Sequence, residues 1–197
     1  MIINSLLCCF LLFLQLAATH PIDPADTVYY SDSGFVEFTS SVPMHSFSGK
    51  SEQLNGMIDF EENIIDFYID LTTLKTGIGK RDRDMYQTLN TEEHPFAEFT
   101  GSFEAPSPIP DQRTKVTAIG EFTINGVTKE VEVQGFIEPN EEGLLLEAKW
   151  SLLLSDYDIE PPGILFYRVD DTQEIRIQLV LKPTSRQELT AENETGA

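Results

Sequence analysis

Cysteine is scarce in this sequence of 197 residues: there are two, Cys8 and Cys9, and both lie in the first apolar segment. A chain from which this segment is removed has no thiol, which excludes a disulfide framework, a thiol nucleophile and a cysteine-ligated metal. Such a chain depends on its hydrophobic core alone, and about 160 residues are enough to bury one core of that kind. A lipid anchor is not expected, because it would need a cysteine just after the apolar segment rather than in its middle.

Positive charge is also scarce. The chain has 13 Lys and Arg against 33 Asp and Glu, which gives a net charge of −20, and none of these residues lies in the first twenty. The imbalance therefore belongs to the rest of the chain, whose surface repels nucleic acid and anionic lipid headgroups. Helices that bind membrane surfaces are usually rich in Lys and Arg. We therefore predict no nucleic-acid partner and no stable membrane insertion.

The N-terminus carries the only long apolar run. Residues 2–16 are almost all apolar, small residues follow at 17–19, and a polar stretch broken by prolines follows at 20–24. This pattern is typical of a signal peptide, here residues 1–19, and predicts an exported protein, periplasmic or secreted. The run is shorter than the roughly 20 residues that usually span a membrane, but the alternative of a retained N-terminal anchor stays open, because about 18 apolar residues is the lower limit.

The remaining chain alternates apolar and polar residues in several runs, which is typical of half-buried strands. Asn125-Gly126 lies between two of these runs and predicts a hairpin with a type I′ turn, because that turn needs positive φ at both positions. The regular spacing of the runs favours an antiparallel all-β sandwich or barrel over residues 34–182. The clearest runs are residues 35–39, 56–60, 65–71, 96–103, 116–124, 127–133, 144–154 and 175–181.

Three segments do not follow the strand pattern. Residues 76–94 are polar and charged, and Met85 and Leu89 are spaced for a short helix with one apolar edge on the barrel. Asn90 is a suitable C-terminal stop for this helix. Residues 20–33 are expected to be a leader, and residues 183–197 a disordered tail.

Metal sites and catalytic motifs are not evident. His45 and His94 are far apart in sequence and have no partner at metal-ligand spacing. A calcium loop starting at Asp82 would need glycine at its sixth position, where the chain has Gln87. The charged run that begins at Arg81 is therefore interpreted as a solvated helix with alternating charges. We predict no metal and no cofactor.

Catalytic carboxylates are not indicated either. Glu92-Glu93 and Asp170-Asp171 are adjacent pairs, which point to opposite faces when they lie on a strand. No serine lies in a Gly-x-Ser-x-Gly context. The sequence therefore predicts no catalytic residue and a protein that is not an enzyme.

The inward faces of the strands are the remaining candidate site. A barrel of about eight strands can be filled by its side chains or can hold one small ligand. Alternation alone favours the filled interior, because every barrel core needs it. The inward-type positions, which are the candidate ligand-binding residues, are Phe67, Ile69, Phe99, Phe122, Trp150 and Leu152.

Read as a series, several segments resemble the YceI-like family of lipocalin-like barrels from the bacterial periplasm. The most specific is the hairpin Gly-Glu-Phe-Thr-Ile-Asn-Gly-Val-Thr-Lys at residues 120–129, close to the family pattern G-x-L-T-I-x-G-V-T-K. The resemblance extends over residues 34–182. The other segments that carry it are residues 47–49, 54–60, 69–74, 81–89, 94–99, 156–159 and 174–181.

The resemblance implies an extended antiparallel barrel of about eight strands, closed on one side by a short helix. It also implies an apolar tunnel that holds an isoprenoid or another lipid, without catalysis, and this favours a ligand over a filled core. The six candidate residues above still come from alternation, since the family has no invariant contact set to carry over. The alternative is an interaction or stress-response module with a packed core and an acidic binding surface. The oligomeric state is open, a homodimer included.

Overall fold

The structure is a computed structural model that describes residues 26–42, 45–104, 111–161, 163–164 and 167–195. The expected signal peptide, both cysteines and the first part of the expected leader lie outside these residues. No helix within the described ranges is long and apolar enough to cross a bilayer.

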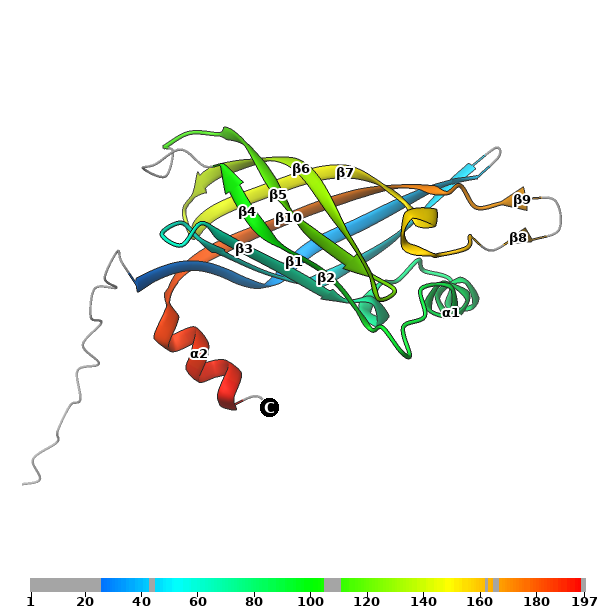
Figure 1. The fold of residues 1–197 in the computed structure, drawn as a ribbon, viewed down its shortest axis with the longest axis horizontal. Coiled ribbons are helices and arrows are strands. Elements are labelled where there is room, and N and C mark those ends of the chain that lie inside the picture. Colours follow the sequence, from blue (N-terminus) through cyan, green and yellow to red (C-terminus); the bar gives the residue numbers. More distant parts are fainter. Residues whose placement is uncertain (1–25, 43–44, 105–110, 162, 165–166, 196–197) are drawn as a thin grey trace, which may run out of the picture.

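Eight antiparallel strands close into one elongated barrel (Figure 1). Around the barrel, the strands follow one another in the order β1-β10-β7-β6-β5-β4-β3-β2. This confirms the predicted all-β antiparallel barrel of about eight strands. The strands are β1 (Thr27–Val42), β2 (His45–Asp59), β3 (Ile64–Asp70), β4 (Phe96–Glu104), β5 (Thr114–Ile124), β6 (Val127–Asn140), β7 (Gly143–Leu153) and β10 (Thr172–Ser185).

Alternation of side chains accounts for the strands. In β3, Ile65, Phe67 and Ile69 are buried, whereas the intervening Tyr68 is exposed. Successive residues of a strand point to opposite faces, so one set fills the barrel and the other meets solvent. The β5–β6 hairpin has positive φ at both turn residues, 53° at Asn125 and 72° at Gly126, as the Asn-Gly pair predicts.

The first strand begins earlier than expected. Residues 27–33, interpreted from the sequence as part of a leader, belong to β1, where Tyr29 pairs with Ile58 of β2 and Pro183 of β10. The register shifts between Ser31 and Gly34, which marks an irregularity of the β-bulge type. A bulge adds a residue to one strand and so interrupts the alternation by which the strand could have been found.

Helix α1 (Gly79–Thr88) lies at one end of the barrel, the same end as the short two-stranded sheet of β8 (Gly163–Ile164) and β9 (Tyr167–Arg168) (Figure 1). This confirms the predicted short helix. Met85 and Leu89 pack against the core, and the helix is followed by Asn90 at a φ of 53°. Two 3-10 helices, η2 (Leu71–Thr73) and η3 (Leu154–Tyr157), follow β3 and β7 at the same end.

Helix α2 (Arg186–Thr195) lies at the opposite end (Figure 1). Residues 183–197 were expected to form a disordered tail. Instead, β10 continues to Ser185 and α2 follows it directly. Polar composition alone suggested disorder, yet Arg186 Nη2 lies 2.6 Å from Asp59 Oδ2 at the start of the β2–β3 connection. This ion pair joins the start of α2 to the barrel.

The hydrophobic core is tightest at the α2 end. Ile58, Ile137, Leu144 and Leu181 are no more than 1% exposed there. Next to them, Phe60 stacks edge-on against Tyr29 and Phe103, with ring centroids 5.4 and 5.3 Å apart. Edge-to-face aromatic pairs of this kind are favourable beyond the area they bury. This end of the barrel is therefore closed by packed side chains.

Candidate functional site: a cavity inside the barrel

The interior between the packed end and α1 is hollow. A cavity of about 840 Å³ runs inside the barrel, and all eight barrel strands contribute lining residues. This volume lies in the upper part of the range of roughly 300–1,000 Å³ seen for small-molecule sites, which are mostly apolar. The interpretation of the interior as a fully packed core is therefore wrong for this part of the barrel.

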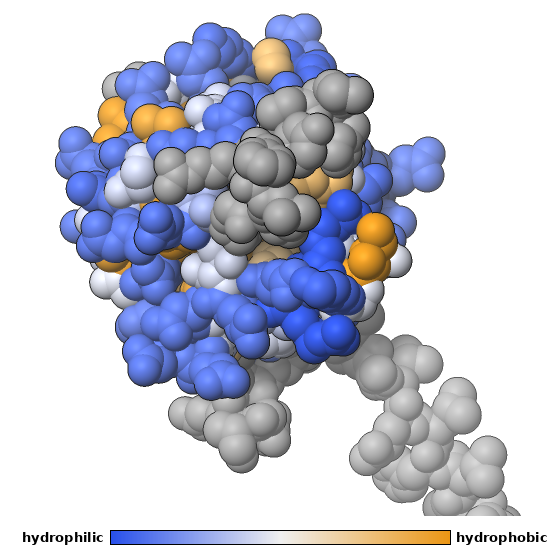
Figure 2. Space-filling model, turned by 90° about the vertical axis from the view of Figure 1, so that its right-hand side faces the viewer, coloured by the Kyte–Doolittle hydropathy of each residue, from blue (hydrophilic) through white to orange (hydrophobic). Residues whose placement is uncertain are grey.

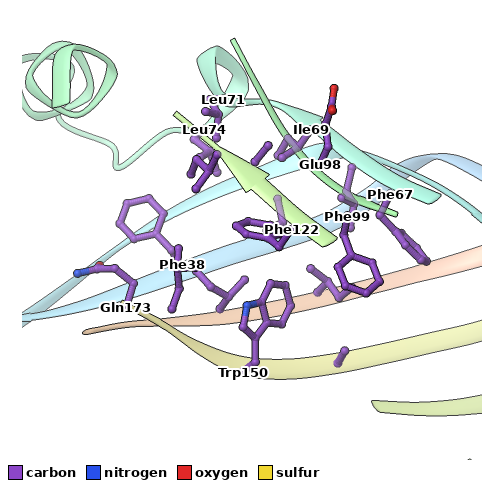
Figure 3. Close-up of a pocket in the computed structure, with 18 of the residues that line it drawn as sticks. Phe38, Phe67, Ile69, Leu71, Leu74, Glu98, Phe99, Phe122, Trp150 and Gln173 are labelled. Carbon is purple, nitrogen blue, oxygen red and sulfur yellow. The ribbon is translucent and has the colours of Figure 1, made fainter. Parts of the chain in front are cut away.

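All six residues singled out from the sequence line this cavity (five are labelled in Figure 3). Phe67 on β3 pairs in register with Phe99 on β4, and Phe99 pairs with Phe122 on β5, so three aromatic rings follow one another around the wall. Trp150 and Leu152 lie on β7, where they pair with Ile175 and Gln173 of β10. Their role as ligand contacts is taken up below as a proposal.

The aromatic side chains show why the space is not filled. Phe99, Phe122 and Trp150 point into the barrel, yet each is only partly buried because it borders the cavity (Figure 3). The ring of Phe122 contacts Trp150 and Tyr157 edge-on, with centroids 6.3 and 5.5 Å apart. These contacts hold the rings in place along the wall. Burial also raises the pKa of the Tyr157 hydroxyl, which keeps that ring neutral.

Polar side chains reach the cavity mainly at the α1 end. Gln173 is 5% exposed, and its Nε2 donates to the carbonyl of Asp170 at 2.6 Å. Lys80 and Asp84 of α1 also line the cavity and pair with each other at 2.7 Å. Viewed from this end, the described surface is mostly hydrophilic with a few scattered apolar residues (Figure 2). The cavity therefore has an apolar body and a polar end.

Arg81 belongs to this polar end. Its Nη2 donates to the carbonyl of Thr76 at 2.9 Å, and its guanidinium lies 4.5 Å from the centre of the Phe47 ring. Thr76 in turn donates its backbone N–H to Asp82 Oδ1 at 2.8 Å and also donates its hydroxyl to that atom. The hydroxyl hydrogen bond is the main reason that the pKa of Asp82 lies below its ordinary value.

Sequence reasoning missed several lining residues. Phe38 and Ile175 alternate inward on their strands and could have been found by the rule that found Phe67. Leu71 and Leu74 follow the end of β3, and nothing in their local pattern places them at a cavity. Arg81 was interpreted as part of a solvated helix, but it faces the cavity; only the tertiary position of α1 reveals this.

Within the described ranges, no group of three or more His, Cys, Asp or Glu side chains is arranged to hold a metal. The ionisable side chains that line the cavity are Lys80, Arg81, Asp84, Glu98 and Tyr68, and of these Lys80 pairs with Asp84. Glu98 points away from the aromatic wall (Figure 3). The arrangement is suited to holding an apolar molecule.

Comparison with protein families matches residues 27–181 to the YceI-like domain. The match begins at the first residue of β1, seven residues before the expected start of the domain, and ends within β10. A comparison with curated proteins gives no match.

Several solved structures share the fold. A polyisoprenoid-binding domain from Saccharophagus degradans, implicated in plant cell wall breakdown, is 16% identical with a TM-score of 0.68, over 80% of this chain and 98% of that one. BcnA from Burkholderia cenocepacia is 17% identical with a TM-score of 0.61, over 75% and 95%. The YCEI protein of Campylobacter jejuni is 18% identical with a TM-score of 0.54, over 70% and 84%. At these identities the likeness concerns the fold alone.

Proposed function

Because this chain belongs to the YceI-like family, we propose that it binds or carries an apolar ligand, an isoprenoid or another lipid, inside its barrel. The observation that carries this proposal is the apolar cavity of about 840 Å³. Burying apolar surface contributes roughly 25 cal/mol per Å² removed from water, so a long hydrocarbon chain would gain strongly from entering.

The shape of the cavity favours a long, thin ligand. On β5, lining residues extend from Val116 to Ile124. At about 3.4 Å per residue, this stretch measures roughly 27 Å along the strand. A linear or isoprenoid chain fits such a space better than a compact ring system does. The polyisoprenoid binding attributed to the Saccharophagus degradans domain supports the same class of ligand here.

The proposed contacts are the six residues identified from the sequence: Phe67, Ile69, Phe99, Phe122, Trp150 and Leu152. Each lines the cavity, and four of them are aromatic. Large aromatic side chains present extensive apolar area at a small cost in side-chain entropy, which suits a wall that must accept a flexible chain.

The function is proposed to be binding without catalysis, in an exported protein that is periplasmic or secreted. The apolar run of residues 2–16 supports export. The net charge of −20 supports the absence of a nucleic-acid partner. N-terminal sequencing of the protein recovered from its host would test export, since it should begin after residue 18 or 19.

Trp150 allows a direct test of binding, because it is the single tryptophan of the chain and lines the cavity. Titration with geranylgeraniol, an uncharged isoprenoid alcohol, is expected to change the Trp150 emission saturably as the ligand removes water from the indole. The variant Trp150→Phe should lose this signal while still binding the alcohol in equilibrium dialysis. Unchanged emission of the native protein, together with no retention in dialysis, would overturn the proposal.

A further inference from the structure

Among the described residues, two cationic side chains line the cavity, Lys80 and Arg81. They differ in whether a carboxylate pairs with them. Lys80 is exposed, and its Nζ lies 2.7 Å from Asp84 Oδ2. Arg81 makes no ion pair with a described carboxylate; its one hydrogen bond joins Nη2 to the carbonyl of Thr76. Arg81 is therefore the lining cation with charge to offer to a ligand.

The Nε atom of Arg81 is buried and has no hydrogen-bond partner among the described atoms. A buried donor that belongs to a charged group is costly to leave unpaired. The ring of Phe47 lies 4.5 Å from the guanidinium and attracts its charge, but it is no substitute for a hydrogen-bond acceptor at Nε. A ligand atom that accepts a hydrogen bond would remove this penalty.

The Thr76 carbonyl and the Phe47 ring hold the Arg81 guanidinium in place, and neither of them carries a charge. The carboxylate of Asp82 is turned to Thr76, whose N–H lies 2.8 Å from Oδ1. Asp84 pairs with Lys80, and Glu98 points away from the aromatic wall (Figure 3). Neither Asp84 nor Glu98, the two acidic side chains of the lining, forms an ion pair with Arg81.

The position of Arg81 gives the ligand an orientation. Phe47 pairs in register with Ser40, and Ser40 pairs with Gln173, so Arg81 and Gln173 belong to the same end of the cavity. The opposite end is lined by Ile58, Phe103 and Ile137, which offer no polar group. A ligand with one polar head would therefore place that head beside α1 and its tail toward Phe103.

We propose that Arg81 binds the anionic head, a phosphate or a carboxylate, of the lipid whose chain occupies the cavity. This inference rests on the proposed function and deepens it. A guanidinium presents several N–H groups in a fixed plane that matches the oxygens of either anion. In a protein with a net charge of −20, a lining cation without an ion pair to a described carboxylate, such as Arg81, is the group best placed to bind an anion.

The test compares probes that share one chain and differ in the head: hexadecyl phosphate, palmitate and hexadecanol, with inorganic phosphate as a probe without a chain. Dissociation constants are measured at low ionic strength for the native protein, Arg81→Gln and Arg81→Lys. Arg83→Gln is the matched control, because Arg83 lies on the same helix but is exposed and does not line the cavity.

The native protein should bind the two anionic lipids at least about tenfold more tightly than hexadecanol, as expected for hydrogen bonds to a charged group. Arg81→Gln should remove this preference and leave hexadecanol binding within about twofold, a change too small to reflect a lost charged hydrogen bond. Arg81→Lys should keep part of the preference, and Arg83→Gln all of it.

Other results would overturn the inference. A preference that survives in Arg81→Gln, or that Arg83→Gln removes equally, would contradict a specific role for Arg81. If the native protein binds all three lipids equally, the inference that Arg81 selects an anionic head is overturned, but the proposed binding of an apolar ligand is not. Binding of none of them would overturn both. Saturable binding of inorganic phosphate that depends on Arg81 would assign the site to a free anion.

Discussion

Leu152 and Leu181 are leucines on adjacent strands, β7 and β10, with different surroundings. Leu152 is 6% exposed and lines the cavity, whereas Leu181 is fully buried at the packed end and does not line it. Leu152→Trp should cost less than about 1 kcal/mol of unfolding free energy, because the indole can enter the cavity. Leu181→Trp should cost roughly 1–3 kcal/mol through overpacking.

Urea unfolding followed by circular dichroism measures both costs, and dialysis against geranylgeraniol measures binding. Leu152→Trp should also weaken binding, because the new side chain occupies the ligand's space; Ile69→Trp is expected to behave alike. Equal destabilisation by Leu152→Trp and Leu181→Trp would mean that the region around Leu152 is as well packed as the closed end.

For individual residues, the sequence predicted many of the side chains that line the cavity. Alternation identified Phe67, Phe99 and Trp150 as inward-facing, because side chains on one face of a strand share one environment. Alternation could not say whether that face meets other side chains or a cavity, since both require apolar residues. Alternation could not identify Arg81. On a short polar helix, nothing in the local sequence indicates which face of the helix the rest of the protein covers.

Among the elements, the β5–β6 hairpin depends most clearly on one residue. Gly126 has a φ of 72°, and a Cβ there would lie 2.7 Å from His94 Cε1. Gly126→Ala should lower the unfolding free energy by about 1–2 kcal/mol, since L-residues are strained in the left-handed region.

Gly79→Ala is the control for this substitution. Gly79 is the first residue of α1, and the nearest atom to its added Cβ is Arg83 Nη1 at 3.9 Å. There the change should be neutral or slightly stabilising, because alanine favours helix over glycine by up to about 1 kcal/mol. Thermal unfolding compares the two variants, and a Gly126→Ala protein as stable as the Gly79→Ala protein would argue against the turn geometry.

Element boundaries were harder to predict than the elements themselves. The hairpin at Asn125-Gly126 and the helix before Asn90 have strong local signals. The start of β1 was missed because a bulge interrupts its alternation, and α2 was missed because its polar sequence suggested disorder. The contact that holds α2, Arg186 with Asp59, joins residues far apart in sequence.

For the whole molecule, the net charge of −20 should make stability depend on salt. Like-charge repulsion destabilises a compact state, and raising the ionic strength from about 10 to 150 mM shortens the screening length from roughly 30 to 8 Å. The surface ion pairs, such as Arg113 with Glu147 at 2.8 Å, would weaken, but exposed pairs contribute at most about 1 kcal/mol.

The melting temperature at pH 7 should therefore rise with salt over this range, as differential scanning calorimetry can measure. The effect should shrink at about pH 4.3, the isoelectric point that the composition gives, because the net negative charge is then small. A melting temperature that falls with salt at pH 7 would mean that ion pairs outweigh repulsion in this barrel.

The hollow interior is also compatible with a stable domain that has no disulfide among its described residues. Tight packing is concentrated at the α2 end, with Ile137 and Leu181 at 0% exposure, and the eight strands pair with one another all the way around the barrel. The packed end and the closed ladder of strands stabilise the fold, so the middle of the barrel can remain hollow.

Native mass spectrometry of the protein purified from its own host, without detergent, tests the central claim most directly. The account predicts a complex heavier than the mature polypeptide, with an apolar molecule that organic solvent extracts, and a Leu152→Trp variant that carries less of it. A mass equal to that of the polypeptide alone, with no lipid in the extract, would contradict the claim that the barrel holds a ligand.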